Sequence, residues 1–323
     1  IVHSDHEALL PQTVHHVPND PGIRWTKDPG IAIDVRDATG DWRNLTPNVI
    51  SLDNGFRMYY TESGPGSDYR ASRGQIMSAF SEDGSTWEKE QGIRLGPHGL
   101  HANLRVVCPD VIPLPGGGYR MYIEGQARGN PSYVVSATSK DGLNFEPDPG
   151  FRFGDGQRSY GSPRCLYLPW EAGAPRYRLY FHSYTYPLVP GLESSNSIVS
   201  ATSRDGLEFA IEPGVRIDQK TDMEDYSVYA AEALLLGDGS YRMYYAGWSK
   251  EPVRGYILGA TSTDGVEWKK DPEPLVSPGG EWDALKCSEP CVIQLHDGTY
   301  KMYYEASDAD GVWRILSATA ESQ

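Results

Sequence analysis

The sequence predicts an all-β fold made of one repeated unit. Three features indicate it: a four-strand pattern that recurs along the chain, an Asp-Gly turn in most copies, and a composition suited to short strands. The 323 residues include 35 Gly, 24 Pro and 21 Tyr; tyrosine favours strands, whereas glycine and proline mark turns. No apolar run approaches the ~18 residues of a membrane span. Because no break in composition divides the chain, we expect a single domain over residues 1–323.

Each repeat predicts a strand, a turn, an aromatic second strand, and a third strand that leads into Asp-Gly-x-x-Trp or Asp-Gly-x-x-Phe. The turn aspartates lie 58, 64 and 59 positions apart (83 to 141, 141 to 205, 205 to 264). Asp-Gly between two alternating apolar runs is a strong hairpin signal. The aromatic second strands agree in register, at residues 56–60, 119–122, 177–181, 241–245 and 300–304. A period of about 60 residues with four strands per copy is typical of a propeller blade, so we predict five four-stranded antiparallel blades.

The fifth repeat lacks its last strand, because no further Asp-Gly turn follows residues 317–319. A segment near the other end of the sequence resembles the missing strand: residues 25–29 read Trp-Thr-Lys-Asp-Pro, and residues 268–272 read Trp-Lys-Lys-Asp-Pro. A ring that takes its last strand from its first residues leaves no exposed sheet edge. We therefore predict that residues 21–33 form the closing outer strand of blade five, and that residues 1–20 are an N-terminal extension.

Polar residues mark the predicted innermost strands, whose starting ends would line a central funnel. Alignment of the copies gives one matched position per blade, occupied by Asn48, Asp110, Arg164, Glu232 and Cys291. Two residues earlier, on the same face of a regular strand, lie Thr46, Cys108, Ser162, Ala230 and Glu289. A mirror count across each hairpin places opposite them Thr61, Glu124, His182, Ala246 and Glu305. Unpaired carboxylates are costly at an inner ring, so the pattern predicts a functional site; a structural pair between Arg164 and a carboxylate is the alternative.

The loops that enter these strands add aromatic and charged residues, namely Trp42, His98, His101, Arg158, Tyr160, Tyr229 and Trp282. Sugars stack on aromatic rings and hydrogen-bond to charged groups, so this mixture is typical of a saccharide site. His98 and His101 have no third partner for a metal, and we interpret them as solvated loop histidines. We expect no cofactor and no metal site, although a structural cation in the central channel would fit the ring.

The net charge limits the kinds of binding partner, and the cysteine content bears on disulfide bonds. The net charge of −15 argues against nucleic-acid and anionic-membrane partners. The four cysteines form no disulfide framework, and we expect Cys108, Cys165 and Cys291 to be buried thiols. Neither feature decides between a secreted mature protein and a cytoplasmic one, and the oligomeric state stays open.

The repeated Ser-x-Asp-Gly-x-x-Trp turns, together with the acidic inner-strand start Cys108-Pro109-Asp110-Val111, resemble the five-bladed propeller glycosidases. These include glycoside hydrolase family 43 and its relatives that act on arabinans, xylans and fructans. The resemblance covers nearly the whole chain at the level of the repeat. It implies a carbohydrate-active enzyme with an Asp base, an Asp that tunes a pKa and a Glu acid on the first three inner strands. Only Asp110 carries over, because Asn48 and Arg164 stand where the base and the acid are expected.

Two carboxylates can still cleave a glycosidic bond, so we predict a glycoside hydrolase that removes a terminal sugar in a central funnel pocket. The expected catalytic residues are Asp110 with Glu232 or Glu289, and His182 is an alternative acid. The expected substrate-binding residues are Asn48, Arg164, Glu124, Glu305, Arg105, Arg158, Tyr160, Tyr229, Trp282 and Trp42. Arg105, Arg158 and Arg164 could hold a carboxylated sugar. The alternatives are a carbohydrate-binding propeller without catalysis and a propeller enzyme with other chemistry, such as a lyase, a cyclase or a sugar phosphorylase.

Overall fold

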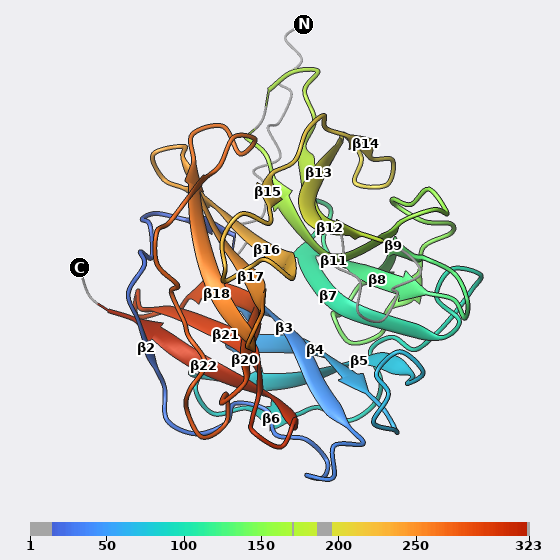
Figure 1. Cartoon of the computed structure of the whole chain (residues 1–323). Helices are drawn as coiled ribbons and strands as arrows, with labels where there is room; N and C mark the ends of the chain where they lie inside the picture. Colours follow the sequence, from blue (N-terminus) through green and yellow to red (C-terminus); the bar gives the residue numbers. More distant parts are fainter. Residues whose placement is uncertain (1–14, 170, 186–195, 322–323) are drawn as a thin grey trace, which may run out of the picture.

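The computed structural model describes residues 15–169, 171–185 and 196–321, and these contain strands and turns but no helix (Figure 1). The all-β prediction is therefore confirmed. Within these ranges there is no helix of the length and hydropathy needed to cross a membrane.

The strands form repeated antiparallel units that run from a long inner strand to a short outer one. The first two units contain β3 (Arg43–Leu52), β4 (Gly55–Ser63), β5 (Gly74–Ser81) and β6 (Glu88–Lys89), then β7 (Arg105–Pro113), β8 (Tyr119–Gln126), β9 (Ser132–Ser139) and β10 (Glu146–Pro147). The third contains β11 (Ser159–Tyr167), β12 (Tyr177–Tyr184), β13 (Ser197–Ser203) and β14 (Ala210–Ile211), with β15 (Ile217–Asp218) also paired to β13. The fourth contains β16 (Ser227–Leu236), β17 (Tyr241–Lys250), β18 (Val253–Ser262) and β19 (Lys269–Lys270).

The last unit draws its strands from both ends of the sequence. It contains β20 (Lys286–Gln294), β21 (Tyr300–Ser307), β22 (Trp313–Ala320) and β2 (Trp25–Lys27). β2 pairs antiparallel with β22, so that Trp25 lies opposite Ala320. The short β1 (His16–Val17) pairs with β16 in parallel, and residues 16–17 of the expected extension are thus part of the sheet structure.

The repeated Asp-Gly sequence forms one hydrogen-bonded turn. In the first unit Asp83 accepts the backbone N–H groups of Ser85 and Thr86, and Gly84 has φ +73°, a left-handed conformation that glycine adopts without steric cost. A second-strand tyrosine of the neighbouring unit donates its hydroxyl to each turn glycine carbonyl: Tyr59 to Gly142, Tyr122 to Gly206, Tyr180 to Gly265 and Tyr303 to Gly84, at 2.5–2.8 Å.

In the last unit, Gly22 occupies the position of the turn glycine. Tyr244 donates its hydroxyl to the Gly22 carbonyl at 2.9 Å. The Trp25 ring then packs edge-on against Tyr244, with centroids 5.6 Å apart, as Trp87 packs against Tyr303 at 5.4 Å. The segment at the start of the chain therefore makes the contacts that an Asp-Gly-x-x-Trp turn makes elsewhere.

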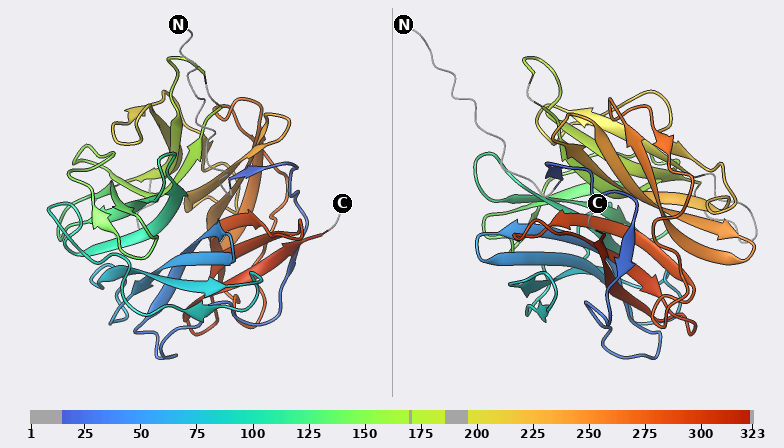
Figure 2. Two further views of the ribbon diagram at one scale, coloured as in Figure 1. Left: turned by 180° about the vertical axis from the view of Figure 1, so that it is seen from behind. Right: turned by 90° about the vertical axis from the view of Figure 1, so that its left-hand side faces the viewer.

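The hydrophobic core lies between neighbouring units. One cluster contains Ile293 and Tyr303 of the last unit together with Val49, Phe56 and Met58 of the first. Each inner strand contacts the next in the order β3, β7, β11, β16, β20, and β20 contacts β3 again. The inner strands therefore surround a common axis (Figure 1 and Figure 2), and polar side chains on them converge on that axis.

Candidate functional site

A β-bulge in each inner strand decides where its polar side chains point. In β3 the pairing with β4 shifts between Leu45 and Asn48, and the other four inner strands shift at the matching point. The residues inside the bulges have φ between +44° and +57°: Thr46, Cys108, Ser162, Ala230 and Glu289. This conformation is uncommon for residues with a side chain, and it gathers at functional sites. Because it breaks the period of two, the expectation that the two polar sets share one strand face is wrong.

The second residue after each bulge residue points into a closed network, which we call the buried ring: Asn48, Asp110, Arg164, Glu232 and Cys291. All of them are at most 2 % exposed. Four accept a backbone N–H of another inner strand: Asn48 from Val111 at 2.9 Å, Asp110 from Cys165 at 2.6 Å, Glu232 from Val292 at 3.1 Å and Cys291 from Val49 at 3.3 Å. The buried ring therefore links the inner strands to one another.

Two basic side chains lie beside the carboxyl groups of the buried ring. Arg164 Nε lies 3.1 Å from Glu232 Oε2. His15, which is 2 % exposed, places Nε2 at 3.8 Å from Asp110 Oδ1 and 3.7 Å from Glu232 Oε1. Burial raises the pKa of Asp110, against the lowering effect of His15 and Arg164. The expected catalytic Asp110 and Glu232 thus hold the strands together, as do Asn48 and Arg164, and none of the four lines the cavity described next.

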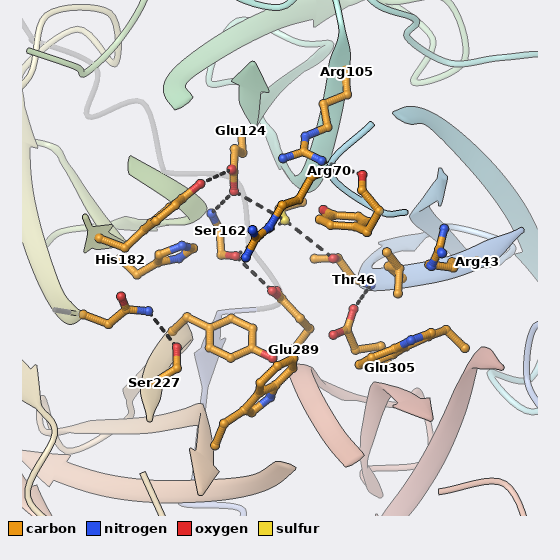
Figure 3. A pocket seen from close by; sticks show the side chains of 18 of the residues that line it. Arg43, Thr46, Arg70, Arg105, Glu124, Ser162, His182, Ser227, Glu289 and Glu305 are labelled. Carbon is orange, nitrogen blue, oxygen red and sulfur yellow. Dashed lines mark hydrogen bonds between the residues drawn. The ribbon is translucent and has the colours of Figure 1, made fainter. Parts of the chain in front are cut away.

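The bulge residues Thr46, Cys108, Ser162 and Glu289 line a cavity of about 350 Å³ (Figure 3). Three predicted second-strand residues join them there: Glu124, His182 and Glu305. Their backbone partners lie one residue before each bulge residue, as Glu124 opposite Val107 and Glu305 opposite Ser288 show. The remaining lining residues are Arg43, Leu45, Tyr69, Arg70, Arg105, Tyr184, Asn196, Tyr226, Ser227, Tyr229, Trp248 and Trp313.

Three carboxylates meet at this cavity, each held by different donors. Glu124 accepts the Ser162 backbone N–H at 3.3 Å and the Tyr184 hydroxyl at 3.0 Å. Glu289 accepts the Ser162 hydroxyl through Oε1 at 2.9 Å. Glu305 accepts two groups, which are the Thr46 backbone N–H at 3.0 Å and the Ser288 hydroxyl at 2.7 Å. Ser162 thus bridges Glu124 and Glu289 by its main chain and its side chain.

Burial shifts the proton affinity of these groups. It raises the pKa of Glu289 well above its usual range, and the Glu305 carboxylate raises it further while Arg164 lowers it. Burial also raises the pKa of Glu305, against hydrogen bonds from Ser288 and Thr46 that lower it. Two neighbouring carboxylates do not readily ionise together, so this pair retains a proton at a pH where an exposed glutamate has lost its own. Burial lowers the pKa of His182 to about 4, which makes its imidazole neutral at pH 7.

Several buried polar atoms around the cavity have no hydrogen-bond partner among the described residues: Glu289 Oε2, Tyr229 Oη, His182 Nδ1, Arg105 Nε and Trp248 Nε1. Buried polar groups in native proteins are normally paired. Atoms of the buried ring also lack hydrogen-bond partners in the described part of the chain, but there Glu232 Oε2 and Arg164 Nε face each other at 3.1 Å. The unpaired groups at the cavity belong to residues that line an open space, which indicates that a polar ligand completes them.

Four further residues predicted to bind substrate do not line the cavity, and each of them contacts another part of the molecule. Arg158 donates to the Ser183 hydroxyl at 2.8 Å, and Tyr160 packs in the core and donates to Asp155 at 2.6 Å. Trp42 lies under the Arg36 guanidinium at 4.2 Å, and Trp282 lies under that of Arg314 at 4.9 Å.

The two loop histidines also lie outside the cavity. His98 Nδ1 is 2.9 Å from the Gly96 carbonyl oxygen, and His101 packs against the rings of Tyr133 and Phe151. Across the part of the chain that the structure describes, no three His, Cys, Asp or Glu residues are grouped to hold a metal ion. All four cysteines are free and buried, as expected for three of them.

Sequence reasoning missed part of the cavity wall. Tyr69 and Arg70 come from the loop 64–73 between β4 and β5, and Trp248 and Trp313 stand at strand ends outside the aligned repeat. One signal could have indicated this loop: it is ten residues long (64–73), whereas the connection between β17 and β18 has two residues (251–252). His15 carried no such signal, because nothing in its local sequence places it at the axis.

No family model matches the chain, and no curated protein matches it. Solved structures do. A protein solved in a complex with RGII aligns at a TM-score of 0.79 with 16% identity, over 94% of this chain and 94% of its own. A thermostable family-43 glycoside hydrolase aligns at 0.71 with 15% identity, over 90% of this chain and 93% of its own.

A third structure comes from the GH130 family of mannoside phosphorylases, which contains glycoside hydrolases that target β-1,2 mannosidic linkages in Candida mannan. It aligns at a TM-score of 0.70 with 14% identity, over 95% of this chain and 99% of its own. Identities this low bear on architecture alone, and at that level they confirm the resemblance drawn from the repeat. This chain has the fold of the glycosidase-type β-propellers.

Proposed function

We propose that the protein is a glycoside hydrolase that removes a terminal sugar in the cavity of about 350 Å³. The observation that carries the proposal is Glu289: a buried carboxyl with a raised pKa whose Oε2 has no partner, beside two further carboxylates. A cavity of this volume lies at the small end of the range for ligand pockets, about 300–1,000 Å³, which favours the end of a saccharide. Trp248, Trp313 and Tyr229 supply aromatic surface for a sugar ring.

The repeated units support one architectural proposal as well. We propose that they are five blades of a single ring, whose last outer strand is β2. The cyclic order of contacts between inner strands and the pairing of β2 with β22 support it. In such a ring, side chains from all blades reach one central site, which is where the three carboxylates lie.

In the proposed reaction Glu289 is the general acid. Its retained proton passes from Oε2 to the glycosidic oxygen as the bond from that oxygen to the anomeric carbon breaks. Glu124 is the second carboxylate, because it lies at the same cavity and is held in place by the Ser162 N–H and the Tyr184 hydroxyl. It stabilises the positive charge that develops at the anomeric carbon. Water then adds its hydroxyl to that carbon, and the proton that the water loses returns Glu289 to its protonated form.

A screen of aryl glycosides and oligosaccharides tests this reading, with monosaccharide release as the measurement. We expect Glu289→Gln to lower kcat by about 10²–10⁴-fold on oligosaccharides, the range for loss of a general acid. The loss should be far smaller on aryl glycosides with acidic leaving groups, since these need no proton. The matched control is Glu212→Gln. It removes a carboxylate that does not line the cavity and that accepts a hydrogen bond from Arg178 Nε at 2.9 Å.

Other outcomes assign the protein elsewhere. Full activity of Glu289→Gln would rule out this acid. Tight binding of a saccharide with no turnover would instead establish a carbohydrate-binding propeller. Turnover that requires inorganic phosphate would establish a phosphorylase, which the arginines at the cavity favour as the second candidate.

A further inference from the structure

The rim of the cavity is cationic on one side only. The first residues of the inner strands are equivalent positions, and they are Arg43, Arg105, Ser159, Ser227 and Lys286. The three cations belong to β20, β3 and β7, which are consecutive around the axis. Arg70 from the loop 64–73 adds a further positive charge to the lining. Figure 3 shows Arg43 and Arg105 on the side of the cavity away from His182 and Ser227, and Arg70 extending over the middle of the view.

Two of these arginines are buried without a direct ion pair, and carboxylates act on them only through space: Glu124 on Arg105, and Asp68 and Asp41 on Arg43. Arg43 is 7% exposed and Arg105 is 5% exposed, and in the described ranges neither forms an ion pair with an acidic side chain. Arg43 donates to the carbonyls of Gly66 and Ser67, the first at 3.0 Å. Arg105 donates to the Tyr69 carbonyl at 2.8 Å. Arg70, the third arginine, is exposed. These bonds orient the guanidinium groups but do not neutralise them.

The arginines are also held in a geometry that suits an oxyanion. The Tyr69 ring lies 4.6 Å from the Arg105 guanidinium, which limits the orientations that this side chain can take. Arg105 Nε is buried and lacks a hydrogen-bond partner among the described residues, so its N–H is available to a ligand. Planar guanidinium groups bind carboxylate and phosphate oxygens in pairs. The chain as a whole has a net charge of −15, so arginines without ion pairs at the cavity stand out against an acidic protein.

We propose that Arg43, Arg70 and Arg105 form a subsite for the carboxylate of an acidic sugar. The inference rests on the proposed function, and it makes the substrate class a glycoside that contains a uronic acid. The sugar carboxylate lies at the arginines, while the scissile bond lies at Glu289 and Glu124. Free phosphate is the other source of an oxyanion for the same groups, and the experiment separates the two.

The test measures binding to the Glu289→Gln protein by calorimetry, so that no turnover is needed. The probes are oligosaccharides of galacturonic acid and of glucuronic acid, their neutral galactose and glucose counterparts, and inorganic phosphate. We expect an acidic probe to bind at least 10-fold more tightly than its neutral counterpart, with a preference that falls as salt rises. Adding Arg70→Gln should reduce this preference about 5-fold or more, because the acidic probe loses a charge partner that the neutral probe does not use. Because Arg70 is exposed, this change should not affect folding.

The matched control is Arg24→Gln, which removes an exposed arginine outside the cavity and should change neither affinity. Equal affinity for acidic and neutral probes, no binding of any probe, or an unaltered preference in Arg70→Gln would overturn the proposal. A different result would assign the subsite to phosphate instead. In that case phosphate is the only probe that binds, Arg70→Gln weakens its affinity, and turnover requires it. An acidic preference without hydrolysis by the wild type would refute the hydrolase and leave the subsite standing.

Discussion

The buried ring and the cavity start from the same bulges and use similar side chains, but their hydrogen bonds differ. In the buried ring, Asp110 and Glu232 accept backbone N–H groups of other inner strands, and Glu232 Oε2, which accepts no hydrogen bond from the described residues, lies 3.1 Å from Arg164 Nε. At the cavity, Glu289 Oε2 has neither a hydrogen-bond partner nor an ion pair in the part of the chain that the structure describes. Both regions contain buried carboxylates. The difference shows that a buried acid on a propeller axis is assigned to structure or to chemistry by its partners, since residue type and burial are the same.

The largest contrast should come from changing one glutamate in each region. Glu232→Gln leaves Arg164 buried without its counter-charge, so we expect the free energy of unfolding to fall by about 3–5 kcal/mol. Glu289→Gln should keep or raise that stability while it lowers kcat as given above, because functional groups held without partners are a common source of instability. Denaturant unfolding and kinetics on both variants check this. A stable Glu232→Gln protein with lost activity would reverse the assignment of the two regions.

A smaller effect is expected from His15→Ala. His15 lies between two carboxylates of the buried ring at 3.8 and 3.7 Å, and its removal leaves them less shielded. We expect a loss of about 1–3 kcal/mol, the range for a buried polar group that loses its compensation. Unfolding by urea measures the loss, and His16→Ala, at the neighbouring position, is the comparison. A loss of activity without a loss of stability would place His15 in the chemistry instead.

The pH dependence of stability should also separate the regions, by a smaller amount. Glu289 has a raised pKa in the folded state, so its stabilising contribution is complete below the unfolded value, about 4.3, and is lost as pH rises through the folded value. Glu289→Gln has no such loss, because an amide does not titrate. The melting temperature of the variant minus that of the wild type should therefore increase from acidic to neutral pH. A constant difference would contradict the raised pKa.

The thiols of Cys291 and Cys108 offer the finest comparison. Cys291 accepts the Val49 N–H at 3.3 Å inside the buried ring, so Cys291→Ala should cost about 1 kcal/mol by leaving that donor unpaired. Cys108 lines the cavity, where its thiol lies 3.5 Å from the Ser162 hydroxyl and 3.6 Å from the Thr46 hydroxyl. Water in the cavity can replace those contacts, so Cys108→Ala should change stability by less than about 0.5 kcal/mol. Thermal unfolding of both variants decides it. Equal losses would mean that the cavity wall is as tightly constrained as the buried ring.

Sequence reasoning reached most of the fold, because the signals for it are local. Asp-Gly turns and the aromatic second strands appear in fixed register, and Trp25 with Gly22 repeats their pattern near the start of the chain. These features depend on hairpin geometry, which short sequences encode. The strands, the register of the second strands and the β2 segment could therefore be predicted from the sequence alone.

The candidate site was only partly accessible, and the bulges explain why. Register alone identified Glu124, Glu289, Glu305 and His182 among the lining residues. It also selected Asp110 and the rest of its set, because strict alternation puts positions i and i+2 on one face. Position i itself is left-handed, which separates the two faces, and the residues at that position include Thr46 and Cys108. Because neither is a glycine, the sequence does not indicate that conformation. The loop that brings Tyr69 has no periodicity from which its path could be inferred.

The pairing of β2 with β22 has a consequence in time. Trp25 and Ala320 are paired but are separated by 295 positions (320 − 25). At the usual rate of synthesis, about 5–20 residues per second, roughly 15–60 s pass between making one partner and making the other. During that interval the Trp25 segment has no β22 to pair with, and no earlier strand can complete the last sheet. The ribosome must therefore synthesise β22 before β2 finds its place, and a protein that captures residues 21–33 in that interval would hold the molecule open.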